Sequence, residues 1–252
     1  MLRKKESVKE EWDDAAEAWV SFVREGKDHY RDGLNNPAAF KLLGNVKGKI
    51  ILDLACGEGY NTRILSRLGA KVVGVDFSKK MIELARQEET KEKLNIRYYA
   101  LDACSLKEFP SNYFDIVTCF MSLQDIEHYE EAIAEVARVL KNKGRFVFSI
   151  PHPCFETITL NGKRASASER YCGIVKYLIH WDMKRLSKPF LTSPFHRALT
   201  DYFSVINKNK LFVSRLVEPR PTLKEVRKYP QLKGVLMRPQ SIIVECVKTA
   251  VK

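Results

Sequence analysis

The sequence predicts an α/β protein with a doubly wound, Rossmann-like sheet of seven mostly parallel strands and helices on both of its faces. Between residues 49 and 150, short runs rich in β-branched residues alternate with stretches of helical periodicity. This alternation is typical of parallel strands joined by crossover helices. The 252 residues, 45% of them hydrophobic, are enough for an ordinary buried core. No internal repeat competes with this interpretation.

The expected elements of the central region follow one another regularly. Five short β-rich runs are expected strands: residues 49–54, 71–75, 96–100, 114–120 and 144–150. Three stretches with apolar residues at helical spacing are expected helices: residues 60–68, 79–89 and 129–140. The third helix is followed by Lys141 and Gly144, a basic end and a stop. Residues 46–150 are therefore expected to form the core of the domain.

The flanking regions have different patterns. Residues 1–45 are expected to form an N-terminal helical cap, because Trp12, Trp19 and Phe22 recur at helical spacing in one amphipathic helix. Residues 151–195 lack a regular pattern and are longer than an ordinary connection, so we interpret them as a substrate or lid insertion. Residues 196–252 return to the core sheet.

The C-terminal region is expected to complete the sheet with an antiparallel pair. A helix is expected near residues 196–209, followed by strands at 211–218 and 241–248. No stretch between these two strands has a strong helical crossover pattern. An antiparallel hairpin at the sheet edge is therefore favoured over a parallel pair.

Charge is distributed unevenly along the chain. The first 150 residues carry equal numbers of basic and acidic side chains, so the whole formal net charge of +12 lies in the remainder. A basic surface there would attract an anionic partner, such as RNA or a phosphorylated or carboxylated small molecule. It would equally serve as a solubilising surface.

The sequence contains few signals for membranes, disulfides or metals. No run approaches the roughly 18 apolar residues of a membrane span, and the N-terminus is charged. The six cysteines include no C-x-x-C pair, so neither a disulfide framework nor a zinc site is indicated. A cytoplasmic protein without a membrane partner or bound metal is expected.

A glycine-containing turn joins the first expected strand to the first expected helix. Gly57 and Gly59 let the backbone turn sharply and approach a ligand at the helix N-terminus, where free N–H groups favour an anion. A dinucleotide fingerprint would need a third glycine at the position of Thr62. The turn therefore disfavours nicotinamide and flavin dinucleotides.

Three carboxylates end three successive strands around this turn. Asp53 ends the first strand, Asp76 follows the second, and Asp102 follows the third. A carboxylate at the position of Asp76 can accept both hydroxyls of a ribose. Asp102 with the next backbone N–H can pair with the edge of adenine. Three acids at neighbouring strand ends favour one adenosine-binding pocket over coincidental packing.

Five segments occur in order across residues 49–150. They are D-L-A-C-G-E-G, V-V-G-V-D-F-S with Met81 and Ala85 on the next helix, D-A, F-D-I-V-T-C and R-V-L-K-N-K-G. Together they resemble the class I S-adenosylmethionine-dependent methyltransferases, and in particular the branch that often acts on small molecules. The resemblance implies S-adenosyl-L-methionine as cofactor, S-adenosyl-L-homocysteine as product, and these binding residues: Tyr30, Arg31, Asp53, Ala55, Cys56, Gly57, Gly59, Asp76, Phe77, Met81, Asp102, Ala103, Phe120, Met121 and Ser122.

The resemblance also implies a role for each group of residues. Gly57 and Gly59 would pass beneath the methionine portion, Asp76 would hold the ribose, and Phe77 and Met81 would flank the adenine. Asp102 and Ala103 would bind the edge of the adenine. Residues 120–122 would line the sulfonium, and residues 30–31 would approach the methionine carboxylate.

Three histidines are candidates for a general base that removes a proton from the acceptor: His128, His152 and His196. His152 leaves the fifth strand between two prolines, where it would face the acceptor. His196 and Arg197 are expected to begin the helix after the insertion. Methyl transfer itself needs mainly alignment of the reacting atoms, so a motif specifies these residues poorly.

The expected function is methyl transfer to a small, possibly anionic, acceptor at oxygen, nitrogen or carbon. The alternatives are an RNA methyltransferase that uses the basic C-terminal part, and a catalytically silent subunit that binds S-adenosylmethionine. A dinucleotide oxidoreductase is a further alternative. Methylation of exocyclic base amines is disfavoured, because Cys119 to Ser122 replace the usual Asn/Asp-Pro-Pro-aromatic turn. Pro153-Cys154 follows the fifth strand rather than the fourth, which disfavours cytosine C5 methylation.

Overall fold

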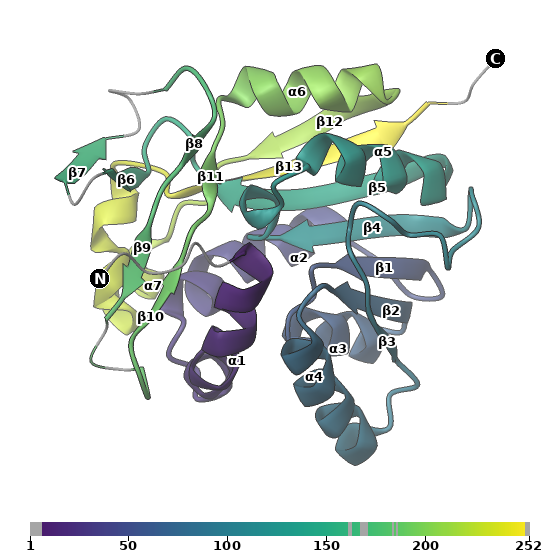
Figure 1. Ribbon diagram of the computed structural model, residues 1–252, viewed down its shortest axis with the longest axis horizontal. Coiled ribbons are helices and arrows are strands. Elements are labelled where there is room, and N and C mark those ends of the chain that lie inside the picture. The colour runs from purple at the N-terminus through teal and green to yellow at the C-terminus, as the bar shows by residue number, and fades with distance from the viewer. Residues whose placement is uncertain (1–6, 161–162, 167–170, 183, 185, 250–252) are drawn as a thin grey trace.

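The computed structural model describes residues 7–160, 163–166, 171–182, 184 and 186–249 (Figure 1). A central seven-stranded sheet has the order β12-β13-β5-β4-β1-β2-β3. Its strands are β1 (Ile50–Leu54), β2 (Lys71–Asp76), β3 (Arg97–Ala100), β4 (Phe114–Phe120), β5 (Leu140–Pro151), β12 (Leu211–Val217) and β13 (Ser241–Lys248). Strands β1 to β5 pair in parallel, whereas β13 is antiparallel to both β5 and β12. The predicted fold class and the antiparallel pair at the edge are confirmed.

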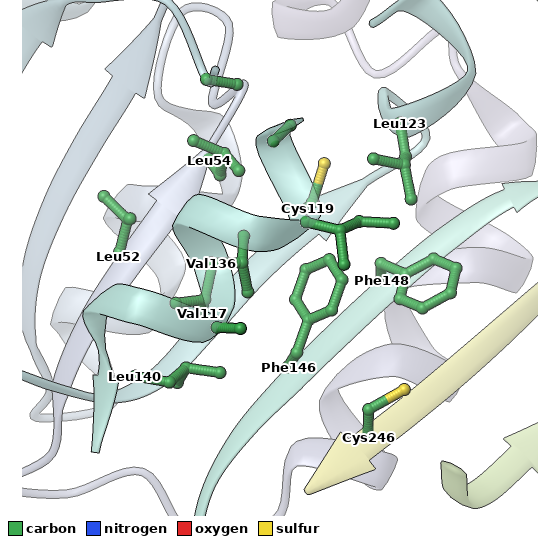
Figure 2. Packing of buried hydrophobic residues seen from close by; sticks show 14 of the residues in the cluster. Leu52, Leu54, Val117, Cys119, Leu123, Val136, Leu140, Phe146, Phe148 and Cys246 are labelled. Carbon is green, nitrogen blue, oxygen red and sulfur yellow. The ribbon is translucent and has the colours of Figure 1, made fainter. Parts of the chain in front are cut away.

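Helices cover both faces of this sheet. They are α2 (Asn36–Leu43), α3 (Tyr60–Arg67), α4 (Lys79–Glu92), α5 (Tyr129–Val139) and α6 (Leu199–Lys208). Successive residues of a strand point to opposite faces, so Ile51 packs with α2 and α3 while Leu52 packs on the face of α5 and α6. Figure 2 shows the second of these clusters, in which Phe146 of β5 lies beside Val136 of α5 and stacks with Phe148. The strand ends are thereby held in fixed positions.

The N-terminal region contains three helical elements rather than the one that was predicted. Helix α1 (Val8–Arg24) begins with a capping box formed by Ser7 and Glu10. A π-helix, η1 (Arg31–Asn35), then continues directly into α2. The apolar pattern of residues 31–43 was too short to predict these two elements. Helix α1 packs on β10 of the insertion and on α4.

The insertion consists of short antiparallel strand pairs, so the expectation of an irregular segment was wrong. Its strands are β6 (Thr157–Leu160), β7 (Lys163–Ser166), β8 (Val175–Lys176), β9 (Ile179–Trp181), β10 (Phe190–Thr192) and β11 (Phe195–His196). They pair as β6 with β7, β9 with β10, and β8 with β11. Strands of two or three residues have too little alternation to be recognised in a sequence. Figure 1 shows the insertion beside α1, at one end of the sheet.

The start of α6 also differs from the prediction. His196 does not begin a helix, because it pairs with Val175 in the β11–β8 ladder. The helix begins at Leu199, with Ala198 as its N-cap and Asp201 accepting a hydrogen bond from the Ala198 backbone N–H. The remaining elements among the described residues are α7 (Leu223–Lys228) and the 3-10 helices η2 (Leu123–Asp125) and η4 (Pro230–Leu236). Within the described residues, no helix is both long and apolar enough to cross a membrane.

Candidate functional site

A cavity of about 820 Å³ lies at the carboxyl ends of the parallel strands. Its walls come from α1, η1, the β1–α3 turn, the ends of β2 and β4, and the insertion. Fourteen of the predicted cofactor-binding residues line it: Tyr30, Arg31, Asp53, Ala55, Cys56, Gly57, Asp76, Phe77, Met81, Asp102, Ala103, Phe120, Met121 and Ser122. The three strand-end acids therefore border one common cavity.

The two glycines of the β1–α3 turn have different surroundings. Both have positive φ angles, 56° at Gly57 and 80° at Gly59, a region that favours glycine. A Cβ at Gly57 would have no heavy atom within 4 Å, whereas a Cβ at Gly59 would lie 2.4 Å from the Tyr98 hydroxyl. Gly57 lines the cavity, but Gly59 does not. In the structure Gly59 makes room for Tyr98, a role that the sequence did not indicate.

This difference predicts separable effects of two alanine substitutions. Gly57→Ala is expected to cost about 1–2 kcal/mol of folding free energy, the strain of a left-handed backbone, and to add a methyl group beside the cavity. Gly59→Ala has the same backbone strain and also collides with Tyr98, so its total cost is expected to be roughly 2–5 kcal/mol. Urea unfolding of both variants measures this difference. Equal stabilities would show that the Tyr98 ring moves aside freely.

Asp53 holds the base of the turn from inside the protein. Its two carboxylate oxygens accept hydrogen bonds from Thr62 Oγ1 at 2.6 Å and Thr118 Oγ1 at 2.7 Å. Burial raises the pKa of Asp53 to about 6, against the effect of these two hydrogen bonds. Thr62 occupies the position where a dinucleotide fingerprint has its third glycine, so the departure from that fingerprint has a structural role here.

Asp76 joins the β1–α3 turn to the start of α4. Its Oδ2 accepts a hydrogen bond from the Gly57 N–H at 2.8 Å, and its Oδ1 accepts one from the Ser78 N–H at 2.9 Å. Burial raises the pKa of Asp76 to about 6. An ionised carboxylate has about four acceptor positions. The geometry therefore leaves Asp76 capacity to accept further hydrogen bonds from a ligand.

Asp102 is the most accessible of the three strand-end acids. It is exposed, and its Oδ1 accepts a hydrogen bond from the Cys104 N–H at 2.9 Å. The neighbouring Ala103 is buried and also lines the cavity. Asp102 thus lies where a planar ligand edge can reach both a carboxylate and the adjacent backbone.

Tyr30 and Arg31 reach the cavity from η1 and the residue before it. The Arg31 guanidinium lies 3.6 Å from the centre of the Tyr60 ring, and its Nε donates to Asp32 Oδ1 at 2.7 Å. Its Nη2 donates to the Val23 carbonyl at 2.9 Å. The Tyr30 hydroxyl donates to the carbonyl of Gln231 at 3.2 Å. These contacts fix both side chains beside the cavity.

The three candidate histidines lie in different places. His128 is exposed and lines the cavity, whereas His152 and His196 are buried and are not part of its lining. His152 Nε2 lies 2.9 Å from Glu218 Oε1, and its Nδ1 accepts a hydrogen bond from the backbone N–H of Cys154. The ring nitrogens of His152 are therefore engaged inside the protein.

The surroundings of His196 favour a structural, charged ring. Its Nδ1 lies 2.7 Å from Glu156 Oε1, and its Nε2 lies 3.2 Å from the carbonyl oxygen of Tyr171. Burial is the largest single influence and opposes the charged form, but the hydrogen bonds to Glu156 and to the Tyr171 carbonyl, together with the nearby carboxylate charges, raise the pKa of His196. A protonated ring with both nitrogens donating holds no lone pair for an acceptor proton.

Several cavity residues were not identified from the sequence. They are contributed by α1, by η2 after β4, and by the insertion: Trp12, Gln124, Asp125, Glu156, Tyr177, Trp181 and Thr192. Asp125 lies five residues beyond the end of β4, so it lacks the strand-end position that revealed Asp53 and Asp76. The available signal for Asp125 was that it is an acidic residue shortly after the fourth strand. The aromatic residues come from helix and insertion positions whose packing depends on the tertiary fold.

The chain is similar to known methyltransferases. Residues 52–148 match the family model described as a methyltransferase domain. Over 117 residues the chain is 34% identical to a ubiquinone biosynthesis O-methyltransferase of Nitrosococcus oceani, a match that covers 45% of this chain and half of that protein. An uncharacterized protein of Haemophilus influenzae is 29% identical over 196 residues, which cover 74% of this chain and 76% of that protein.

A solved structure supports the same family. The crystal structure of an S-adenosylmethionine-dependent methyltransferase from Mesorhizobium loti has a TM-score of 0.69 and 26% sequence identity, covering 84% of this chain and 96% of that one. The site also fits this cofactor, since Gly57 leaves open space at the turn and Asp76 is a buried carboxylate at the cavity with acceptor positions left for a ligand. Residues 52–148 thus form a methyltransferase domain, and the chain as a whole is similar to S-adenosylmethionine-dependent methyltransferases.

Proposed function

We propose that this enzyme transfers a methyl group from S-adenosylmethionine to a small-molecule acceptor. The observation that carries the proposal is that α1 and the insertion contribute walls to the same cavity as the strand-end acids. A cavity of about 820 Å³ is of the size that encloses small ligands. The similarity to enzymes named ubiquinone biosynthesis O-methyltransferases supports a small acceptor, although the match spans about half of their length.

The proposed cofactor contacts follow the geometry of the strand ends. Asp76 would accept the ribose hydroxyls, Met81 and Phe77 would flank the adenine, and Asp102 with Ala103 would bind its edge. Residues 120–122 would lie beside the reacting centre, and residues 30–31 would approach the methionine carboxylate. When bound, S-adenosylmethionine supplies an electrophilic methyl group. The side chains of this protein then hold the acceptor in line and exclude water.

The acceptor would enter the other end of the cavity. Strands β1, β2 and β3 carry the proposed adenosine contacts, whereas the segment after β4, helix α1 and the insertion carry Gln124, Trp12 and Tyr177. Ligands of doubly wound sheets bind outside the carboxyl ends of the strands. We therefore place the acceptor between η2, α1 and the insertion.

Methyl transfer can be tested with S-adenosylmethionine that is tritiated in its methyl group. The protein is incubated with this donor and either a metabolite extract of the source organism or its total RNA, and the products are separated by ultrafiltration. Label that accumulates in the small-molecule filtrate, beyond a control without protein, is expected. RNase-sensitive label in the retained fraction would instead indicate an RNA methyltransferase.

A binding measurement separates the remaining alternatives. S-adenosylhomocysteine is expected to raise the melting temperature, because a ligand that binds the folded state stabilises it. NAD is expected to have no such effect. Protection by S-adenosylhomocysteine without transfer of label to either pool would favour a silent binding subunit over the proposed enzyme. Protection by NAD alone would favour an oxidoreductase.

A further inference from the structure

Given the methyl transfer proposed above, we infer that Gln124 and Asp125 bind the reacting group of the acceptor. Both would accept hydrogen bonds from it, and Asp125 would remove its proton. The acceptor is then a neutral or cationic molecule whose nucleophile is an N–H or O–H group, rather than an anion. This inference assigns a chemical class to the acceptor and a general base that differs from the three histidines.

Gln124 provides an unused hydrogen-bond acceptor in the cavity wall. Its side chain is only 8% exposed and lines the cavity. Its Nε2 donates to the Met121 carbonyl at 2.6 Å and to Asp125 Oδ2 at 3.0 Å. Both partners are acceptors, which fixes the orientation of the amide. Among the described residues, the buried Oε1 of Gln124 has no partner, so a ligand donor would satisfy it.

Asp125 lies beside this amide with the properties of a general base. Burial raises the pKa of Asp125 to about 7, and the hydrogen bonds from the Trp12 and Gln124 side chains lower it in part. A base whose pKa lies near neutral pH combines an ionised population with a strong affinity for a proton. Both features match removal of a proton from an amine or a hydroxyl group.

The groups around Asp125 come from several elements. Glu11 of α1 raises the pKa of Asp125, and Arg197, which precedes α6, lowers it. The Tyr177 hydroxyl from the insertion and the Cys119 thiol of β4 also lie in the field of Asp125. Glu11 is itself held by hydrogen bonds from the backbone and hydroxyl of Ser193.

The cavity offers an anionic acceptor few cationic side chains that could neutralise its charge. The cationic lysine and arginine side chains that line it are Lys9, Lys27 and Arg31. Each of them already forms an ion pair, with Asp13, Glu25 and Asp32 respectively. A carboxylate or phosphate beside Asp125 would instead meet a like charge, which disfavours its binding.

Aromatic side chains complete the proposed acceptor site. Trp12 donates a hydrogen bond to Asp125, and Tyr177 donates to Glu156 Oε2 at 2.9 Å. Trp181 is oriented by a 2.8 Å hydrogen bond from its Nε1 to Thr192 Oγ1. Aromatic faces stabilise both apolar rings and cations. The wall therefore suits an aromatic or cationic acceptor.

In the proposed transfer, S-adenosylmethionine is the methyl donor. The lone pair of the acceptor nitrogen or oxygen forms a bond to the methyl carbon, and the carbon–sulfur bond breaks with its electron pair passing to sulfur. The leaving group is S-adenosylhomocysteine. The acceptor proton passes to the carboxylate of Asp125 and from there to solvent.

Three probes with the same ring test the preferred class of acceptor: phenethylamine, 2-phenylethanol and 3-phenylpropionate. Their affinities are measured by calorimetry on protein saturated with S-adenosylhomocysteine. We expect the amine or the alcohol to bind at least about tenfold more tightly than the carboxylate. The tighter of the two then identifies the donor as N–H or O–H. Equal or tighter binding of the carboxylate would overturn the inference.

The Asp125→Asn variant tests whether this preference originates at Asp125. Its preference for the amine or alcohol over the carboxylate is expected to fall by about tenfold, while the Glu108→Gln variant keeps it. Glu108 is exposed and does not line the cavity, which makes it the matched control. An unchanged preference in Asp125→Asn would assign the discrimination to another group.

The proton-transfer role has its own measurement. With the acceptor fraction found by the tritium assay, the rate of the wild-type protein is expected to rise with pH through about 7, where Asp125 ionises. The rate of Asp125→Asn is expected to be lower by roughly 10²-fold or more and not to rise with pH. Asp125→Glu is expected to recover part of the rate and part of its rise with pH. If the rate of Asp125→Asn depended on pH in the same way as the wild-type rate, the assignment of Asp125 as general base would be overturned. A wild-type protein that does not bind S-adenosylhomocysteine would instead contradict the proposed function.

Discussion

Asp76→Ala is expected to weaken the binding of S-adenosylhomocysteine by about 1–3 kcal/mol, the cost of leaving buried hydrogen-bonding groups unpaired. Asp76 holds the Gly57 and Ser78 N–H groups while it borders the cavity. Its loss would remove the proposed ribose acceptor and also free the turn beneath the cofactor. Calorimetry at neutral pH measures the change, with Glu108→Gln as a variant of an acid outside the cavity. An unchanged dissociation constant for Asp76→Ala would reject the ribose contact.

The same residue predicts how cofactor binding depends on pH. Because the pKa of Asp76 is raised to about 6, this carboxyl becomes protonated as the pH falls from 7 to 5. A neutral carboxyl accepts hydrogen bonds more weakly than a carboxylate. The affinity of the wild-type protein is therefore expected to fall across this range. The buried Asp53 also has a pKa of about 6, so Asp76→Ala distinguishes the two acids. A profile unaltered by that substitution would assign the dependence to Asp53.

The sequence was sufficient for the features that depend on local patterns. The strand preceding Gly57, the acids Asp53, Asp76 and Asp102, and the antiparallel C-terminal strands each have a short-range signal, and the structure contains all of them in the predicted arrangement. Parallel strands bring their carboxyl ends to one edge, so residues remote in sequence could be placed together. The positions of these residues at the sheet edge do not depend on side-chain packing.

The walls of the cavity that come from α1 and the insertion depend on tertiary contacts, which cannot be predicted from local sequence patterns. His196 follows a proline-containing segment and precedes a helical pattern, which favoured a helix start, but pairing with Val175 places it in a strand. Likewise, Trp12 was recognised as an apolar residue of α1, but its hydrogen bond to Asp125 exists only after α1 packs across the strand ends. The insertion determines the position of His196, and its strands are too short to be predicted.

Arg197 is a residue for which this tertiary organisation predicts a large effect on stability. Its side chain is only 1% exposed, and its guanidinium donates to the carbonyls of Ile126 at 2.7 Å and Glu127 at 3.0 Å. It also lies 4.2 Å from the centre of the Tyr129 ring. Arg197 therefore fixes the segment that carries Asp125 against the start of α5.

Arg197→Met is expected to lower the free energy of unfolding by about 3 kcal/mol, because the part-buried hydrogen bonds to the Ile126 and Glu127 carbonyls and the cation–π contact are lost. The Nε of Arg197 is buried without a partner among the described residues, which offsets part of this loss. Urea unfolding measures the change. The matched control is Arg67→Met, which removes an exposed arginine paired with Glu92 and is expected to cost at most about 1 kcal/mol.

The position of Arg197 also predicts how its substitution would affect methyl transfer relative to cofactor binding. The cofactor contacts at the β1–α3 turn do not involve Arg197, whereas the segment containing Gln124 and Asp125 depends on it. Methyl transfer by Arg197→Met should therefore decline more than its affinity for S-adenosylhomocysteine. Equal stability of the Arg197 and Arg67 variants would mean that water or other side chains replace the guanidinium, and the segment after β4 would then hold its shape without it.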